Sequence, residues 1–194
     1  MGLHKGELID VVEEPSTPEL ERYFQEVGVD LPEGCRAEVD LEGPGLLERM
    51  ACSIERGFTL TIDYGHPAEA LYSERRWQGT LRCYHKHTAS TNLYIRIGRQ
   101  DITAHVDFTS LARAGERAGM VTEGLITQQL YLKKLGIQAF LDHLREADLS
   151  HNDYLANRMS LLELTRPEGF GHFGVLLQSK AVGPLGLDDI VTSR

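Results

Sequence analysis

The most informative stretch of this 194-residue chain is Gly57-Phe58-Thr59-Leu60-Thr61-Ile62-Asp63-Tyr64-Gly65. Its apolar and threonine residues alternate, which predicts a β-strand over 58–62. The strand runs directly into Asp63, and the preceding segment has the pattern of a helix. A helix, a strand and an acidic residue at the strand's carboxyl end make half of a βαβ unit. Ligands of open α/β sheets bind beyond these strand ends, so we expect Asp63 to face one.

Helix signals lie on the amino-terminal side of this strand. Pro44 favours the first turn of a helix, apolar residues follow at helical spacing, and Gly57 is expected to close it. Further upstream, Ser16 and Glu19 have the spacing of a capping box and predict a short helix that reaches Val27. Residues 28–43 read as a loop with at most a short strand.

Residues 66–105 are polar and show little regular pattern. Forty such residues within a domain are typical of an active-site lid or a binding loop. The segment also interleaves aromatic residues with basic ones: Trp77, Tyr84 and Tyr94 with Arg75, Arg76, Arg82, Lys86 and Arg96. These could stack bases or face an acidic partner, and we favour a lid that packs on its own body.

Helices and strands alternate in the remainder of the chain, which predicts an α/β fold. Asp107 and Thr127 are expected to cap helices, and Ser150 and Asp153 stand in capping-box register. The predicted order is helix 108–118, strand 120–126, helices 127–136, 137–148 and 151–164, strand 172–177, and a loose tail over 181–194.

Composition limits the class of protein. Lys and Arg total 20 against 29 Asp and Glu, giving a net charge of −9 and a pI near 5.4. Such a charge disfavours general binding to nucleic acids or anionic membranes. No stretch approaches the ~20 apolar residues of a membrane span. The three cysteines lack C-x-x-C spacing, so a reducing compartment, the cytoplasm, is expected.

Two motifs suggest a ligand site but also have a simpler interpretation. Glu42-Gly43-Pro44-Gly45 resembles a nucleotide-binding turn, but the preceding residues 36–41 alternate with charges, so a helix-opening loop is favoured. A second group of residues could ligate zinc or iron, or could serve as hydrogen-bonding and acid–base groups around a substrate. Its members are His85, His87, Asp101, His105 and Asp107. We expect no metal here, and a metal-dependent hydrolase is the more distant alternative.

Several blocks together resemble one family in order and spacing. They are residues 57–65, Gly79-Thr80-Leu81-Arg82-Cys83-Tyr84 with His87, Gln100-Asp101-Ile102-Thr103-Ala104-His105-Val106-Asp107-Phe108, and Gly124 through Thr127-Gln128 to Gly136. The family is that of the MidA-like class I S-adenosylmethionine-dependent methyltransferases, whose mitochondrial members methylate an arginine of a complex I subunit. The similarity covers roughly residues 7–180.

The resemblance implies the C-terminal part of a class I, Rossmann-like methyltransferase sheet over residues 1–180, followed by the tail. Strand 58–63 would be the fifth strand, 120–126 the sixth and 172–179 the antiparallel seventh, with a helical insertion over 137–164. The resemblance also implies a catalytic group and a substrate-binding group. The catalytic residues would be Asp63, Tyr64, Asp101 and His105, and the substrate-binding residues Gly65, Arg82, His87, Thr103 and Asp107.

The family's glycine-rich donor-binding turn does not occur before residue 57 in this sequence. We therefore expect the chain to carry the substrate-side half of a methyltransferase, with S-adenosylmethionine as cofactor and a protein side chain, arginine, as acceptor. Its partners would be the protein substrate and either a complementary N-terminal half or a second copy, because strand 58–63 would present a hydrophobic edge. The alternative is a non-catalytic assembly module that keeps the substrate surface.

Overall fold

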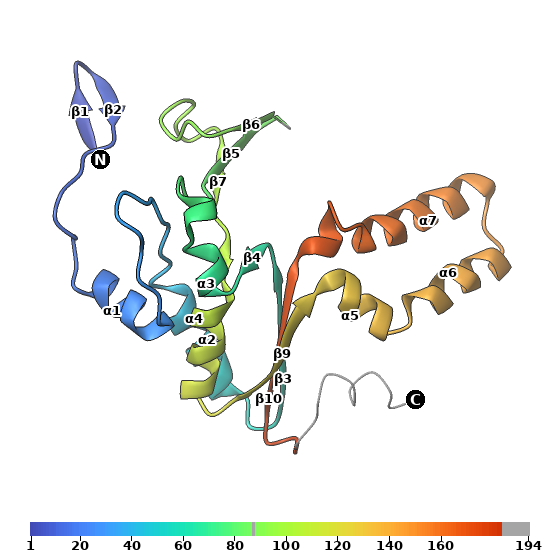
Figure 1. Ribbon diagram of the computed structural model, residues 1–194. Coiled ribbons are helices and arrows are strands. Elements are labelled where there is room, and N and C mark those ends of the chain that lie inside the picture. Colours follow the sequence, from blue (N-terminus) through green and yellow to red (C-terminus); the bar gives the residue numbers. More distant parts are fainter. Residues whose placement is uncertain (87, 184–194) are drawn as a thin grey trace.

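The computed structural model describes residues 1–86 and 88–183, and its centre is a three-stranded sheet (Figure 1). The strands are β3 (Gly57–Asp63), β9 (Val121–Thr127) and β10 (Gly174–Lys180), in the order β3-β10-β9. The last strand is antiparallel to both neighbours, so β3 and β9 run parallel to each other. This is the arrangement that the resemblance implies for the fifth, sixth and seventh strands, and the fold is α/β as predicted.

Helices lie on both sides of this sheet (Figure 1). One side holds α1 (Glu19–Val27), α2 (Gly43–Ser53), α3 (Ala68–Leu71) and α4 (Phe108–Arg117). On the other side α5 (Gln128–Lys134), α6 (Ile137–Glu146) and α7 (His151–Thr165) project as an arm. Residues 137–164, expected as an insertion, are thus helical, while their status as an insertion stays a prediction.

One core forms where α4 packs on β10. Val175, Leu176 and Leu177 are buried, and Gln178 between the two elements is 0% exposed. The Gln178 Nε2 donates to the Ala112 carbonyl at 2.9 Å and to the Thr122 hydroxyl at 3.1 Å. A Cβ on Gly115 would lie 2.4 Å from this amide, so the absence of a side chain permits the close approach of helix and strand.

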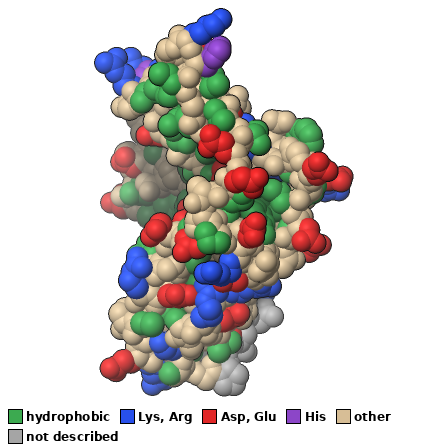
Figure 2. Space-filling view, turned by 90° about the vertical axis from the view of Figure 1, so that its left-hand side faces the viewer, with side chains coloured by type: hydrophobic (Ala, Val, Ile, Leu, Met, Phe, Trp, Pro, Cys, Tyr) green, Lys and Arg blue, Asp and Glu red, His purple; other side chains and the backbone are tan. Residues whose placement is uncertain are grey.

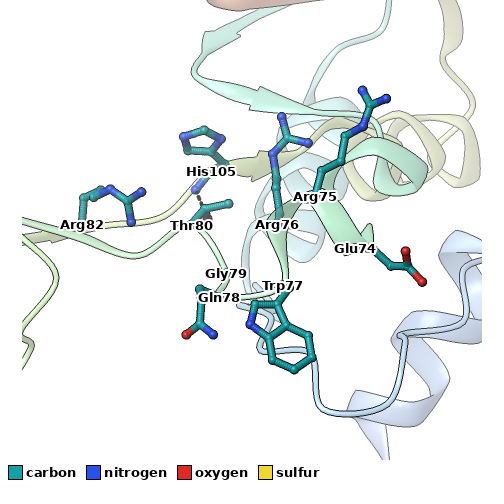
Figure 3. Close-up of a pocket in the computed structure, with 9 residues that line it drawn as sticks. All are labelled: Glu74, Arg75, Arg76, Trp77, Gln78, Gly79, Thr80, Arg82 and His105. Carbon is teal, nitrogen blue, oxygen red and sulfur yellow. Dashed lines mark hydrogen bonds between the residues drawn. The ribbon is translucent and has the colours of Figure 1, made fainter.

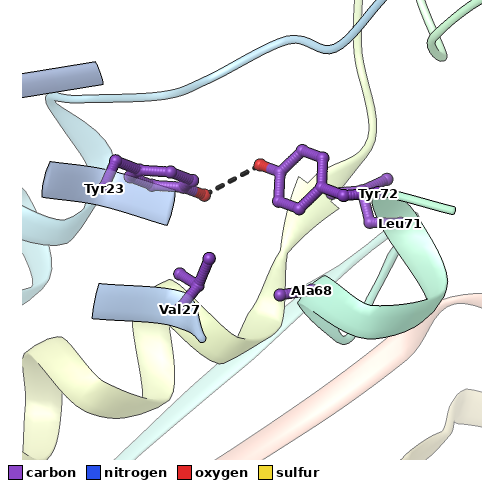
Figure 4. Packing of buried hydrophobic residues seen from close by; sticks show 5 residues of the cluster. All are labelled: Tyr23, Val27, Ala68, Leu71 and Tyr72. Atoms are coloured by element: carbon purple, nitrogen blue, oxygen red, sulfur yellow. Dashed lines mark hydrogen bonds between the residues drawn. The ribbon is translucent and has the colours of Figure 1, made fainter. Parts of the chain in front are cut away.

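A second core joins α1 to α3 (Figure 4). It contains Tyr23, Val27, Ala68, Leu71 and Tyr72. The hydroxyls of Tyr23 and Tyr72 lie 2.9 Å apart, and Tyr23 also donates to Asp107 at 2.7 Å. Burial is the largest cause that raises the pKa of both tyrosines, so their hydroxyls stay protonated.

Residues 66–105 are more regular than predicted. They contain a three-stranded antiparallel sheet of β6 (Thr88–Ser90), β5 (Arg82–His85) and β7 (Asp101–Thr103), and the 3-10 helix η1 (Glu74–Arg76). The two-residue strands β4 (Gly65–His66) and β8 (Val106–Asp107) pair in parallel. Strands this short are too brief to establish a periodic pattern, so the expectation of little regular structure was wrong for these stretches, whereas residues 91–100 hold no helix or strand. A further hairpin, β1 (Gly2–His4) with β2 (Glu7–Ile9), lies near the amino terminus.

Several predicted boundaries also needed correction. Ser16 does not cap α1: the N-cap is Pro18, and Thr17 Oγ1 accepts from the Glu19 amide at 3.3 Å. The second helix ends at Ser53 because Ile54 is already extended, and Gly57 opens the strand instead. At the last strand, residues Phe170–His172 form the 3-10 helix η2, so β10 starts only at Gly174.

Asp107, Thr127 and Ser150 cap their helices as predicted. The tail predicted over 181–194 lies, from residue 184 onward, outside the described residues. In the described part of the chain, no helix is long and apolar enough to cross a membrane.

Candidate functional site

The carboxyl end of β3 is joined to the segment before α4 by close backbone pairing. Val106 N donates to the Tyr64 carbonyl at 3.0 Å, and Gly65 pairs with Val106 in the β4–β8 ladder. A Cβ on Gly65 would lie 2.2 Å from the Val106 carbonyl oxygen. Only glycine allows this approach, so the two sequence blocks that carry Asp63 and His105 meet at one point.

Aromatic and imidazole rings cluster at this meeting point. The His105 ring centroid lies 5.6 Å from that of Tyr64 and 5.4 Å from that of His66. His172, from η2, adds a third imidazole 5.8 Å from His66, and Phe173 packs on Tyr64 at 5.7 Å. His66 and His172 were not among the predicted site residues. The position of His66 directly after Gly65 was the available signal for it.

The two central histidines are neutral at pH 7. Burial, then the positive charge of Arg76 and the nearby His105 and His172, lower the pKa of His66 to about 4. An Arg76 amino group lies 2.7 Å from His66 Nε2, and because arginine only donates, this nitrogen accepts. Burial, followed by Arg76 and Arg82, also lowers the pKa of His105.

A chain of hydrogen bonds fixes the His105 backbone. Its amide donates to Thr80 Oγ1 at 2.9 Å, and Thr80 donates to Glu38 Oε2 at 2.8 Å from both its hydroxyl and its amide. The imidazole Nδ1 of His105 is buried and has no hydrogen-bond partner among the residues the structure describes. The neutral ring as a whole is a candidate proton acceptor for a group that reaches it.

Two cavities meet at His105. The first, which we call the apolar groove, has a volume of about 730 Å³ and runs between α2 and β3. Its lining includes Leu46, Met50, Phe58, Leu60 and Ile62, with Asp63 and His105 also on its wall. The carboxylate of Asp63 accepts from the Tyr64 amide at 2.8 Å through Oδ1. The groove therefore combines an apolar wall with a neutral imidazole and three aspartates, Asp40, Asp63 and Asp107.

The second cavity, which we call the arginine pocket, has a volume of about 350 Å³ (Figure 3). It is lined by nine residues: Glu74, Arg75, Arg76, Trp77, Gln78, Gly79, Thr80, Arg82 and His105. Arg82 was a predicted substrate-binding residue, and the structure places it in the same cavity as the predicted catalytic residue His105.

The remaining predicted site residues lie in different surroundings. Thr103 is directly opposite Arg82 in the β5–β7 pairing, and Asp101 is opposite Tyr84 and exposed. Asp101 and Thr103 are absent from the lining of both cavities. His87 lies outside the described residues.

Asp107, a predicted substrate-binding residue, lines the apolar groove, and it is also largely buried with a structural function. One carboxylate oxygen accepts from the Thr109 amide at 2.8 Å, which caps α4, and the other accepts from Tyr23. Burial raises the pKa of this carboxyl, against the effect of these hydrogen bonds. Among residues 1–86 and 88–183, no group of three or more His, Cys, Asp or Glu side chains is arranged to hold a metal ion.

Comparison with solved structures finds proteins that share this fold over part of their length. A superfamily member from Burkholderia thailandensis bound to S-adenosyl-homocysteine matches 98% of this chain at 27% identity, with a TM-score of 0.81. An uncharacterised member from the same organism matches 89% of the chain at 30% identity, with a TM-score of 0.75. The chain spans about half the length of these proteins, 48% and 46% respectively. No curated protein matches the chain.

A family model gives the same assignment from sequence. The model described as "Putative S-adenosyl-L-methionine-dependent methyltransferase" matches residues 2–126, which include β3, the arginine pocket and His105. The matched residues make up more than half of the chain, and the fold agrees with a solved structure that holds the demethylated donor. The chain therefore belongs to this S-adenosyl-L-methionine-dependent methyltransferase family.

Proposed function

We propose that this chain forms the acceptor side of a methyltransferase that transfers the methyl group of S-adenosylmethionine to a protein side chain, arginine. The observation that carries the proposal is that Asp63 and Tyr64, at the end of β3, lie at the same place as the neutral imidazole of His105. The family match and the S-adenosyl-homocysteine held by the Burkholderia relative support methyl transfer as the reaction.

The described residues fit only one side of the methyl donor. The carboxylate of Asp63 suits the positively charged sulfonium, and the apolar groove offers a surface for the adenosyl part. However, neither Lys nor Arg is among the residues that line the groove, so the donor's methionine carboxylate lacks a cationic partner there. We propose that a complementary part, on the same or another polypeptide, holds the donor.

The side chains of this chain suit the acceptor's half of the chemistry. A guanidinium has a pKa above 12 and must lose a proton for its nitrogen to carry a new methyl group and remain a monocation. Asp63 can orient the guanidinium through a charge-assisted hydrogen bond, and the imidazole of His105, which lines the same groove, can accept the proton because the ring is neutral. Tyr64 packs against His105 and limits the positions of both rings.

A complementation experiment tests this proposal. The full chain is mixed with the part of the Burkholderia relative that it does not cover, tritiated S-adenosylmethionine is added, and arginine-containing peptides are assayed for label. We expect label only in the mixture and a loss of about 100-fold or more in the His105→Gln variant, in line with removal of a general base. Because the pKa of His105 is lowered, the wild-type rate should fall with acid only below the ordinary histidine range.

The second candidate is a non-catalytic assembly module, and the absence of a donor-carboxylate partner in the described groove favours it. The same mixture separates the two functions. Donor binding by calorimetry without any labelled product would support the module, whereas micromolar donor binding by the chain alone would contradict our division into two halves.

A further inference from the structure

The arginine pocket is lined by three arginines from one short region of the chain. Arg75 and Arg76 come from η1, and Arg82 begins β5. Figure 3 shows Arg75 and Arg76 extending to the same side of the η1 backbone, with Arg82 and His105 across from them. The cavity has room for one or two side chains of a ligand, since its volume is about 350 Å³.

No carboxylate forms an ion pair with these arginines in the described part of the chain. Arg76 instead contacts the Ala70 carbonyl and His66, and Arg82 donates to the Leu81 carbonyl at 2.9 Å. Four other arginines do pair with acids: Arg36 with Asp10, Arg117 with Glu26 and Glu48, Arg145 with Asp142, and Arg166 with Glu163.

The chain as a whole is acidic, with a net charge of −9, so a cavity lined by three arginines differs in charge from the rest of the molecule. Figure 2 shows acidic side chains spread over the face of the molecule that carries α1 and the β1–β2 hairpin. Two carboxylates do lie near the pocket. Glu74 is on its wall, and Glu38 is tied to Thr80 through one oxygen, while its other oxygen is buried without a partner among the described residues.

The two histidines near the pocket add no charge to it. His66 and His105 are neutral at pH 7 because burial lowers the pKa of each. The net charge of the pocket's own lining is therefore positive, from three arginines and one glutamate. An anion that enters would gain charge-assisted hydrogen bonds that the protein itself does not provide.

We propose that the arginine pocket binds aspartate or glutamate side chains of an acidic peptide segment. Guanidinium groups match carboxylates in a bidentate geometry, and a 350 Å³ cavity fits side chains rather than a nucleic-acid duplex. The acidic character of the rest of the chain also opposes a long polyanion, while a short acidic segment needs only the local positive charge.

The identification of this peptide as the methyl-transfer substrate rests on the proposed function. His105 lines both the arginine pocket and the apolar groove, so a peptide held by the arginines would have a neighbouring residue close to Asp63. The methyl acceptor would then lie a few residues from an acidic side chain, and the arginine pocket would select substrates by that neighbour.

The chain contains a single tryptophan, Trp77, and it lines the arginine pocket. Its intrinsic fluorescence therefore reports on the pocket without a methyl donor or any reaction. The full chain is titrated with a hexapeptide that contains four aspartate and glutamate residues, and with the matched peptide in which these are asparagine and glutamine. We expect a saturable change in emission with the acidic peptide, and binding at least about tenfold weaker for the neutral one.

Two further comparisons locate the interaction. The Arg75→Gln/Arg82→Gln double variant should bind the acidic peptide about tenfold more weakly. Arg22→Gln, which removes the same kind of charge from α1 outside the pocket, should bind like the wild type. Circular dichroism establishes that both variants are folded, and raising the salt from about 50 to about 300 mM should weaken wild-type binding several-fold.

Equal binding of the acidic and neutral peptides, or wild-type binding that does not respond to salt, would overturn the inference even if a variant failed to fold. Equal binding of inorganic phosphate or of a short single-stranded oligonucleotide would likewise contradict an acidic peptide as the ligand. Since no donor is present, the titration can succeed while the methylation experiment fails, or the reverse, and the two proposals are tested separately.

Discussion

His66 is a neutral histidine held between Arg76 and the His105 ring, and this position makes stability depend on pH. Its pKa is about 4 in the folded chain, against roughly 6.5 when unfolded. Between these values the unfolded state binds more protons than the folded state. The stability contributed by neutral His66 is therefore present above about pH 6.5 and is lost as the pH falls towards 4.

We therefore expect His66→Gln to reduce the pH dependence of unfolding. The urea midpoint of the wild type should fall more steeply between about pH 6.5 and about pH 4.5 than that of the variant, because glutamine does not titrate. His4→Gln, in the β1–β2 hairpin, is the matched control and should leave the wild-type slope unchanged. Parallel midpoint curves for wild type and His66→Gln would contradict a lowered pKa at this residue.

Asp107 supports a helix and a tyrosine with its two carboxylate oxygens. Asp107→Ala removes the α4 cap and leaves the buried Tyr23 hydroxyl with fewer partners, so we expect a loss of about 2–4 kcal/mol in the free energy of unfolding. Asp107→Asn retains a side-chain acceptor for the Thr109 amide and should lose less. Chemical denaturation of both variants measures the difference, and equal losses would argue against the cap.

At the scale of elements, sequence signals found those helices and strands whose side chains have a clear local pattern. The polar caps at Asp107, Thr127 and Ser150 act through neighbouring backbone amides, so spacing alone was sufficient to place them. The strands β4 to β8 were missed because they depend on pairing between distant segments, such as Gly65 with Val106, which leaves little local trace.

The candidate site could likewise be predicted only in part. The resemblance pointed to Asp63, Tyr64 and His105, and the structure brings the rings of the last two within 5.6 Å. The third imidazole, His172, comes from the far end of the chain, and its approach depends on the sheet as a whole. No spacing in the sequence relates it to His66.

The packing of α4 on β10 can be tested through Gly115. Alanine normally stabilises a helix relative to glycine by about 1 kcal/mol. Here the new methyl group would meet the buried, doubly bonded Gln178 amide, and we expect Gly115→Ala to destabilise the chain by about 1–3 kcal/mol. In a Gln178→Ala background the same change should be neutral or stabilising. Thermal or urea unfolding of the four proteins completes the cycle, and additive effects would contradict the contact.

For the molecule as a whole, the apolar groove and the adjoining edge of β3 are the surface most in need of a partner. Phe58, Leu60 and Ile62 alternate along the strand and are each more than 40% exposed. β3 pairs only with β10 in the described sheet. Such an edge favours association with another chain or with a complementary part.

We expect the isolated chain to self-associate as its concentration rises, and Leu60→Lys to reduce the association because a charge on an exposed strand opposes pairing. Val12→Lys, at a residue that is 99% exposed outside the groove, should not. Sedimentation velocity over a range of concentrations measures the effect. Monomeric behaviour of the wild type at all concentrations would contradict it, as would equal association of the two variants.

The position of β10 in the sheet also governs when the chain can fold during its synthesis. β10 lies between β3 and β9 although it follows both along the sequence, and it provides the partners for each of them. A growing chain emerges from the ribosome N-terminal residues first, so β3 and β9 are exposed to the cell before their shared neighbour has been made. Premature termination between residues 127 and 174 would therefore release both strands unpaired, and a chaperone that binds extended apolar segments would be needed longest at β3, the earlier of the two.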